Sequence, residues 1–146
     1  MTLRAFLEAV AGKLTALWPE RKVYVDEMPR DADGNFFVRI VDSSEESHLD
    51  RRGSRTLSFE VLYFMRQKET LPFLDWAEAM YDAFKVLSVK ETAEKTRGVY
   101  LYNREARRND NLAAYQFTFD AAFQFVVAPE EEIPMERLDQ REEVGS

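Results

Sequence analysis

The chain has 146 residues, of which 45% are hydrophobic and 13% aromatic, and it carries a formal net charge of −7. This length and composition indicate one globular domain with a substantial core, and they exclude a disordered or fibrous chain. The absence of cysteine excludes disulfides, thiolate metal sites and cysteine nucleophiles. The N-terminus opens an amphipathic helix rather than a signal peptide, and no window approaches the roughly 18 apolar residues of a membrane helix. We therefore expect a cytosolic protein.

The negative charge is concentrated near the C-terminus. Residues 128–146 contain seven acidic side chains and two arginines, a net charge of −5 that leaves −2 for residues 1–127. We expect a single α+β domain over residues 1–127 and an acidic, flexible tail over residues 128–146. A near-neutral body argues against a general nucleic-acid binder, which needs a net basic face to release counterions.

The first predicted element is a helix over residues 3–17, where apolar side chains recur at spacings of three and four. Thr2 can cap its start, and Pro19 prevents its continuation. Residues 23–25 and 36–41 follow as two short β-rich runs.

Turn-forming residues between these two runs predict that they pair as a hairpin. Residues 31–35 read Asp-Ala-Asp-Gly-Asn, a composition that tolerates positive φ. The polar stretch over residues 42–50 predicts a loop.

The next strand is predicted over residues 56–65, because apolar and polar side chains alternate there. Leu62 and Phe64 fall on the otherwise polar face. We therefore expect the end of this strand to be covered on both sides, by a helix or by another subunit.

The second half of the chain predicts a helix and two strands. Apolar side chains over residues 73–87 repeat at helical spacing, and Thr70 and Pro72 are suitable for a helix start. Residues 99–103 predict a strand. Residues 115–127 predict a long, half-buried strand with one aromatic face.

This order of elements predicts an α+β fold. A single antiparallel or mixed β-sheet of about five strands, with two α-helices packed on one face, satisfies the order α-β-β-β-α-β-β. The helical and aromatic stripes are interpreted as core rather than as the lining of a cofactor pocket, because no polar anchor accompanies them.

The sequence contains no set of residues whose types and spacing are typical of a catalytic site. His48 lies in the polar segment without co-ligands or an activated partner. Residues 31–34 superficially resemble a calcium loop, but the glycine stands at the fourth position where the EF-hand pattern needs it at the sixth. No glycine-rich phosphate loop is present. We predict no catalytic, cofactor-binding or metal-binding residues and no enzymatic activity.

Two basic clusters are the remaining candidates for a binding role. One precedes the predicted strand 56–65, and the other follows the predicted strand 99–103. Their members are Arg51, Arg52, Arg55, Arg104, Arg107 and Arg108. They are interpreted either as solvated loop charge or as assembly contacts with an acidic neighbour, such as the acidic tail of another copy.

Several apolar strand patterns together resemble a known family. The segments are Trp18-Pro19, Val23-Tyr24-Val25-Asp26-Glu27, Phe36-Phe37-Val38, the run from Arg55 to Phe64, and the run from Tyr115 to Asp120. They are similar to the phage tail terminator family of prophages of Gram-positive bacteria, over roughly residues 1–127. The chain departs from the family pattern at Gly34-Asn35, where a proline is expected ahead of the Phe-Phe pair.

The resemblance implies a structural protein of the virion tail that assembles in the bacterial host cytoplasm. Such a subunit forms a ring with itself, expected to be a hexamer on the tail tube, where it stops polymerisation of the tube protein. The ring then presents a surface to the head-completion protein. DNA passes through it without specific binding, and no membrane is involved.

Two alternatives stay open on the sequence alone. The first is a head–tail connector or other tail completion subunit, which would share the size, acidity and fold class. The second is a small-molecule-binding or enzymatic α+β domain, with a pocket between the helix over residues 73–87 and the sheet.

Overall fold

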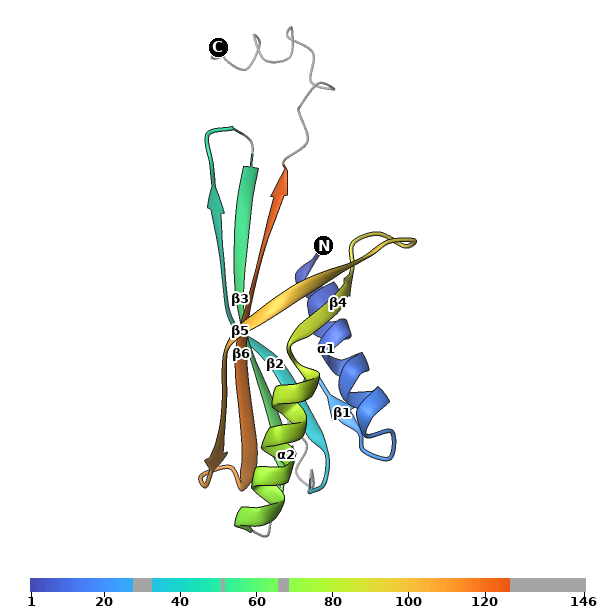
Figure 1. The fold of residues 1–146 in the computed structure, drawn as a ribbon, viewed down its shortest axis with the longest axis vertical. Helices are drawn as coiled ribbons and strands as arrows, with labels where there is room; N and C mark the ends of the chain where they lie inside the picture. The colour runs from blue at the N-terminus through green and yellow to red at the C-terminus, as the bar shows by residue number, and fades with distance from the viewer. Residues whose placement is uncertain (28–32, 51, 66–68, 127–146) are drawn as a thin grey trace, which may run out of the picture.

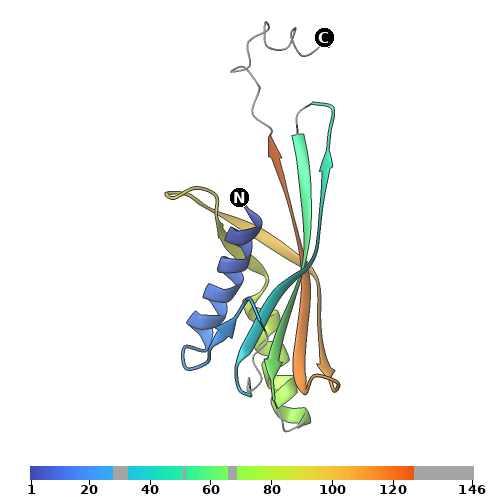
Figure 2. The same ribbon diagram turned by 180° about the vertical axis from the view of Figure 1, so that it is seen from behind.

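The fold consists of two helices and one six-stranded, mixed, curled sheet, seen in a computed structural model that describes residues 1–27, 33–50, 52–65 and 69–126 (Figures 1 and 2). The elements are α1 (Leu3–Leu17), β1 (Val23–Tyr24), β2 (Phe36–Ser47), β3 (Arg52–Phe64), α2 (Thr70–Ala83), β4 (Val86–Lys90), β5 (Thr96–Asn109) and β6 (Ala114–Val126). The predicted α+β class is confirmed, and the structure adds β4 as a further strand. The predicted tail over residues 128–146 lies outside the described residues.

The sheet has the strand order β1-β2-β3-β6-β5-β4. Strand β1 pairs with β2 in parallel, and every other neighbouring pair is antiparallel. The two longest ladders join β3 to β2 and β3 to β6, so these three strands form the central part of the sheet. The sheet curls far enough for α1 to contact β4 as well as β2, which lie near opposite sides of the sheet order.

Helix α1 has the bounds that its apolar periodicity predicts. The Thr2 hydroxyl accepts a hydrogen bond from the Ala5 N–H at 3.0 Å, which satisfies one of the unpaired donors of the first turn. At the other end, the Trp18 N–H donates to the Leu14 carbonyl. Phe6, Val10 and Leu14 are buried on the face that meets the sheet.

Helix α2 ends earlier than predicted, at Ala83 rather than at residue 87. Phe84 is fully buried at the helix end, and its N–H donates to the Met80 carbonyl. From Val86 onward the side chains alternate between exposed and buried, with Leu87 inside. Leu87 satisfies the helical spacing and the strand spacing equally well, which is why periodicity alone assigned it to the helix.

The predicted hairpin of residues 23–25 with 36–41 is wrong, because β1 runs parallel to β2. Of the residues expected to form its turn, residues 31 and 32 lie outside the described part of the chain, whereas Gly34 and Asn35 pair with the end of β3. The Gly34 N–H donates to the Phe64 carbonyl at 2.7 Å, and the Phe64 N–H donates to the Asn35 carbonyl at 3.1 Å. Gly34 adopts φ +81°, a conformation that favours glycine. This segment therefore extends the pairing with the end of β3 and makes no two-strand hairpin.

The polar segment 42–50, predicted as a loop, belongs largely to β2, which continues to Ser47. Its residues pair with β3 as far as Ser47 opposite Gly53. Strand β5 is likewise longer than residues 99–103 and spans Thr96–Asn109. Both extensions are polar and mostly exposed, so they lack the apolar alternation by which a half-buried strand is recognised.

The core lies between the helices and the concave face of the sheet, and it is dominated by stacked aromatic rings. Phe59 stacks on Phe119 with ring centroids 5.2 Å apart, Phe119 on Phe84 at 5.4 Å, and Phe6 on Phe123 at 5.1 Å. Such pairs contribute beyond the area that they bury.

Leu62 and Phe64 are buried on the opposite face, as their position in the strand predicts. They form a second, smaller cluster with Phe37 and Ala114, against which Tyr24 and Leu112 pack. Among the described residues this cover comes from strand and turn side chains rather than from the helix that was one of the two expected covers.

Candidate assembly surface

Three strands of the sheet continue past the helices and form a projection, which we call the arm (Figures 1 and 2). Its base still packs on α1, where Phe123 stacks on Phe6. The arm consists of residues 42–47 of β2, 52–57 of β3 and 121–126 of β6, held together by continuous antiparallel ladders. Residues 42–50 are all exposed. The backbone and polar side chains of β2 in the arm are therefore exposed to solvent, while the base of the arm packs in the core.

The face of the arm on the helix side carries a compact set of cross-strand contacts. The Phe125 ring lies over Gly53, where a Cβ atom would stand 2.6 Å from the ring. Arg55 lies over the same ring, 5.7 Å from its centroid, and its Nε donates to Glu45 Oε1 at 2.6 Å. Each contact joins neighbouring strands, so this set fixes the register of the arm where core packing ends.

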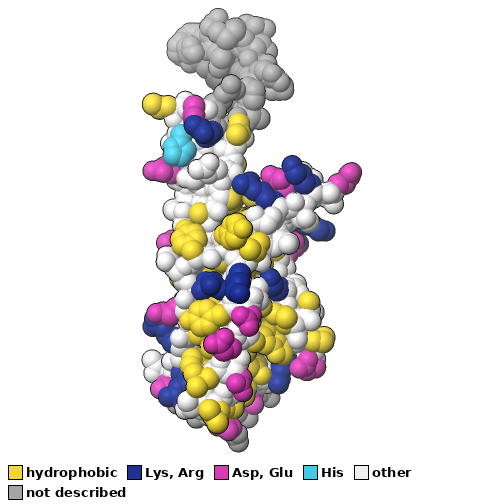
Figure 3. Space-filling model, viewed as in Figure 1, with side chains coloured by type: hydrophobic (Ala, Val, Ile, Leu, Met, Phe, Trp, Pro, Cys, Tyr) yellow, Lys and Arg dark blue, Asp and Glu magenta, His cyan; other side chains and the backbone are white. Residues whose placement is uncertain are grey.

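The other face of the arm is built from small and polar side chains. The residues on this face, which lie opposite one another on the three strands, include Ser44, Ser54, Thr56, Ala122 and Gln124. In the space-filling view the upper part of the molecule is accordingly mostly white, with few hydrophobic side chains (Figure 3). A face of this composition has little apolar surface of its own to bury.

Both outer edges of the arm lack a neighbouring strand among the described residues. Strand β1 pairs only with Phe36 and Phe37, so residues 38–47 of β2 have β3 on one side alone. Pairing between β5 and β6 ends at Leu101 opposite Ala121, so residues 122–126 also have only β3 beside them. Unpaired edges of this length are templates for pairing with another chain.

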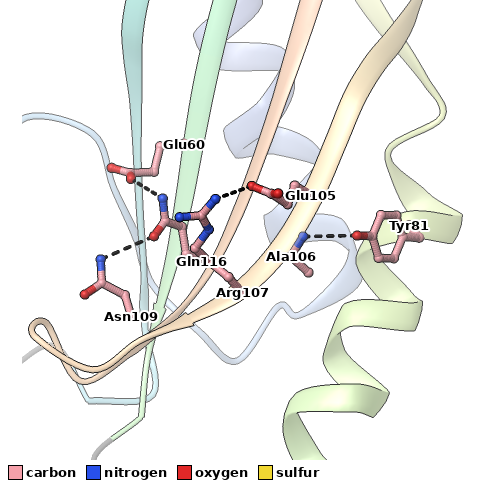
Figure 4. Close-up of polar contacts among 7 residues, drawn as sticks. All are labelled: Glu60, Tyr81, Glu105, Ala106, Arg107, Asn109 and Gln116. Atoms are coloured by element: carbon pink, nitrogen blue, oxygen red, sulfur yellow. Dashed lines mark hydrogen bonds and ion pairs between the residues drawn. The ribbon is translucent and has the colours of Figure 1, made fainter.

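The free edge of β5 at the opposite end of the sheet is covered by α2. The Ala106 N–H donates to the Tyr81 hydroxyl at 3.0 Å (Figure 4). Arg104 Nη1 donates to the Tyr81 carbonyl at 2.6 Å and lies 3.4 Å from the Phe84 carbonyl, at the C-terminal end of the helix. Contacts with α2 thus occupy this edge at residues 104 and 106.

A buried carboxylate joins the central strands on the face away from the helices. Glu60 is 7% exposed; it accepts hydrogen bonds from Arg39 Nε and from Gln116 Nε2, each at 2.7 Å. Gln116 in turn accepts from Asn109 at 3.2 Å (Figure 4). This network satisfies the buried charge within the chain, so it has a structural role.

The basic residues singled out from the sequence are dispersed. Arg51 lies outside the described residues, Arg52 pairs with Asp50 at 2.6 Å, and the Arg52 guanidinium lowers the pKa of that carboxyl. Arg55 is in the arm, and Arg104 is used within the chain, as described above. Arg107 forms an ion pair with Glu105 (Figure 4), and Arg108 is exposed.

The structure does not bring these two clusters together. Arg52 is opposite Val126 on β6, whereas Arg107 is opposite Gln116. Ten residues along one strand separate the two levels, which corresponds to about 33 Å. Two separate surfaces are therefore involved if both clusters make contacts.

His48 lies at the exposed tip of the arm, where its backbone N–H donates to the Arg52 carbonyl. In the part of the chain that the structure describes, no group of three or more His, Asp or Glu side chains could hold a metal ion. None of the described helices is long and apolar enough to cross a membrane.

Comparison with known proteins identifies the class. A family model described as phage tail terminator protein matches residues 5–134, which is most of the chain. The chain belongs to the phage tail terminator family, a family of structural phage proteins. No curated protein matches it.

Proposed function

We propose that this protein caps the finished tail tube as a ring of identical subunits, stops polymerisation of the tube and forms the surface to which the head joins. The observation that carries the proposal is the family match over residues 5–134. The arm supports it, because a projecting, well-registered three-stranded sheet with open edges suits assembly with other subunits.

The partners follow from that role. The tail tube protein binds one side of the ring, the head-completion protein binds the other, and DNA passes through the centre. The net charge of −7 suits a channel through which DNA slides without specific binding. The strand motifs noted above favour a prophage of a Gram-positive host as the source.

The proposal is tested by deleting the gene from a producing strain and examining the particles by electron microscopy. Over-long tails without heads are expected, and a plasmid copy of the intact gene should restore normal length. Tails of normal length that fail to join heads would identify a connector subunit instead. Unchanged infectious particles would rule out a role in virion assembly.

A further inference from the structure

We propose that neighbouring copies join head to tail through their arms, with the open β2 edge of one copy pairing in parallel with the open β6 edge of the next. This inference rests on the proposed ring and names the surfaces that close it. Its occupant is a second copy of this chain.

The first support is the direction of the strands. Strands β2 and β6 are each antiparallel to β3, so they run in the same direction on the two sides of the arm. Copies related by rotation about an axis along the arm present β2 of one beside β6 of the next. Such a heterologous contact uses two different surfaces of each copy and closes into a ring when the rotation allows it.

The second support is the register of the arm, in which residues of β2, β3 and β6 lie at the same level. Glu46, Ser54 and Gln124 are level with one another, as are Ser44, Thr56 and Ala122. Copies at the same height therefore bring residues 44–46 of β2 close to residues 122–124 of β6. Backbone hydrogen bonds supply affinity in this mode of association, and side chains on alternate positions supply specificity.

Charge provides the third support, because the β2 edge is acidic and a basic side chain of β5 reaches the β6 edge. Residues 42–47 of β2 contain Asp42, Glu45 and Glu46 and no basic side chain, although Glu45 is already paired with Arg55 of the same copy. At the β6 edge, Arg97 Nη1 donates a hydrogen bond to the Gln124 carbonyl at 3.4 Å, a bond that a strand pairing at this position would replace.

Arg97 belongs to the hairpin between β4 and β5, which also carries Lys90 and Lys95 and projects to the right in Figures 1 and 3. Its basic side chains are interspersed with Glu91 and Glu94, and Arg97 is 3.9 Å from Glu91. Arg97 is the basic group placed directly at the open edge. The acidic β2 edge of the next copy would give it a further partner, which favours head-to-tail contact over pairing of like edges.

Engineered disulfides can test this contact, since the chain has no cysteine of its own. Residues 46 and 124 of one copy are two strand spacings apart, about 9.6 Å, which exceeds the roughly 7 Å that a disulfide can bridge between Cα atoms. A disulfide between positions 46 and 124 must therefore join different copies. The variants are the full-length Glu46→Cys and Gln124→Cys chains, singly and combined.

The combined variant should form a ladder of covalent multimers under mild oxidation, with a yield roughly tenfold above control because the interface raises the local thiol concentration. Mixing the two single variants should give dimers only. The matched control combines Gln124→Cys with Glu78→Cys, since Glu78 is exposed on α2. Shifted combinations, Ser44→Cys with Gln124→Cys and Glu46→Cys with Ala122→Cys, cover registers that differ by two residues and keep the same face.

Yields at the level of the control for all three registers would overturn the proposal. Dimers formed by Glu46→Cys alone in comparable yield would also overturn it, because they indicate two-fold pairing of like edges. The gene deletion distinguishes this failure from failure of the function. Over-long tails together with absent cross-links would retain the terminator role and reject these edges as the contact.

Charge reversal gives an independent readout in the particle. Glu46→Lys should reduce the number of normal-length tails restored in the deletion strain at least about tenfold, whereas the control Glu78→Lys should restore them fully. Adding Arg97→Glu to Glu46→Lys should recover part of the loss. An Arg97→Glu change that deepens the loss would contradict the pairing of these two edges.

Discussion

The helix-covered half of the sheet and the arm share strands β2, β3 and β6 but are stabilised differently. In the covered half, Phe59 and Val61 of β3 are fully buried against stacked aromatic rings. In the arm, the same strand exposes Arg52 and Thr56 and relies on ladder hydrogen bonds and a few cross-strand contacts. Burial of aromatic rings therefore stabilises the covered half, whereas strand pairing and a few side-chain contacts keep the arm ordered outside the core.

The largest effect is expected from truncating a ring at the centre of the core. Phe119→Ala removes a fully buried side chain that stacks on Phe59 and Phe84, and it should lower the free energy of unfolding by about 3–5 kcal/mol. The matched change in the arm, Phe125→Ala, removes a partly exposed ring and should cost about 1 kcal/mol. Chemical denaturation measures both values. Equal losses would contradict the difference between the two regions.

The buried carboxylate of the covered half gives the next largest effect. Glu60→Ala leaves the donors of Arg39 and Gln116 without their acceptor and should cost about 2 kcal/mol in unfolding free energy. Glu60→Gln keeps one carbonyl acceptor and should cost about half as much. The same denaturation experiment applies, and identical losses for the two variants would argue against the hydrogen bonds as the cause.

A change within the arm should act locally. Gly53→Ala places a Cβ atom 2.6 Å from the Phe125 ring, so the ring has to move. We expect hydrogen exchange of the arm amides to become faster by an amount equivalent to about 1 kcal/mol, with core amides unaffected. In a Phe125→Ala background the same glycine substitution should cost close to nothing. Faster hydrogen exchange of the core amides as well would show that the arm and the core unfold together rather than independently.

The sequence predicted the helix-covered half well, because its elements alternate apolar and polar residues in a regular way. Helix α1, the aromatic strand β6 and the two-sided burial of Leu62 and Phe64 all follow from periodicity. The hairpin of β1 with β2 and the end of α2 were predicted wrongly for the separate reasons given above, whereas the two missed strand extensions share one cause. The continuation of β2 to Ser47 and of β5 to Asn109 lacks an apolar face, so no burial pattern marks these segments as strands.

The candidate surface was predictable only in part for the same reason. The sequence singled out Arg55, which does lie in the arm, but the two open edges depend on which strands are neighbours. Strand order is set by long-range pairing, and no local motif encodes it. Residues 42–47 are rich in Asp and Ser, which favour turns, so the local sequence indicated a loop rather than an extended edge.

The smallest effects on stability are expected in the second basic cluster, where substitution of Arg104 should cost more than substitution of Arg107. Arg104→Ala removes hydrogen bonds to the Tyr81 and Phe84 carbonyls at the end of α2 and should cost about 1 kcal/mol, seen as a lower Tm. Arg107→Ala removes an exposed ion pair with Glu105 and should cost at most about 0.5 kcal/mol. A larger loss for Arg107→Ala would reverse this assignment.

This difference decides how the second cluster should be tested for a role in assembly. Loss of function in an Arg104 variant could arise from the weakened junction between α2 and β5. A combined Arg107→Glu and Arg108→Glu variant keeps that junction, because both side chains are exposed. If this variant keeps its Tm but fails to restore normal tails in the deletion strain, the cluster contacts a partner. Full restoration of normal tails would indicate that Arg107 and Arg108 are solvated surface charges, and the arm would remain the proposed assembly surface.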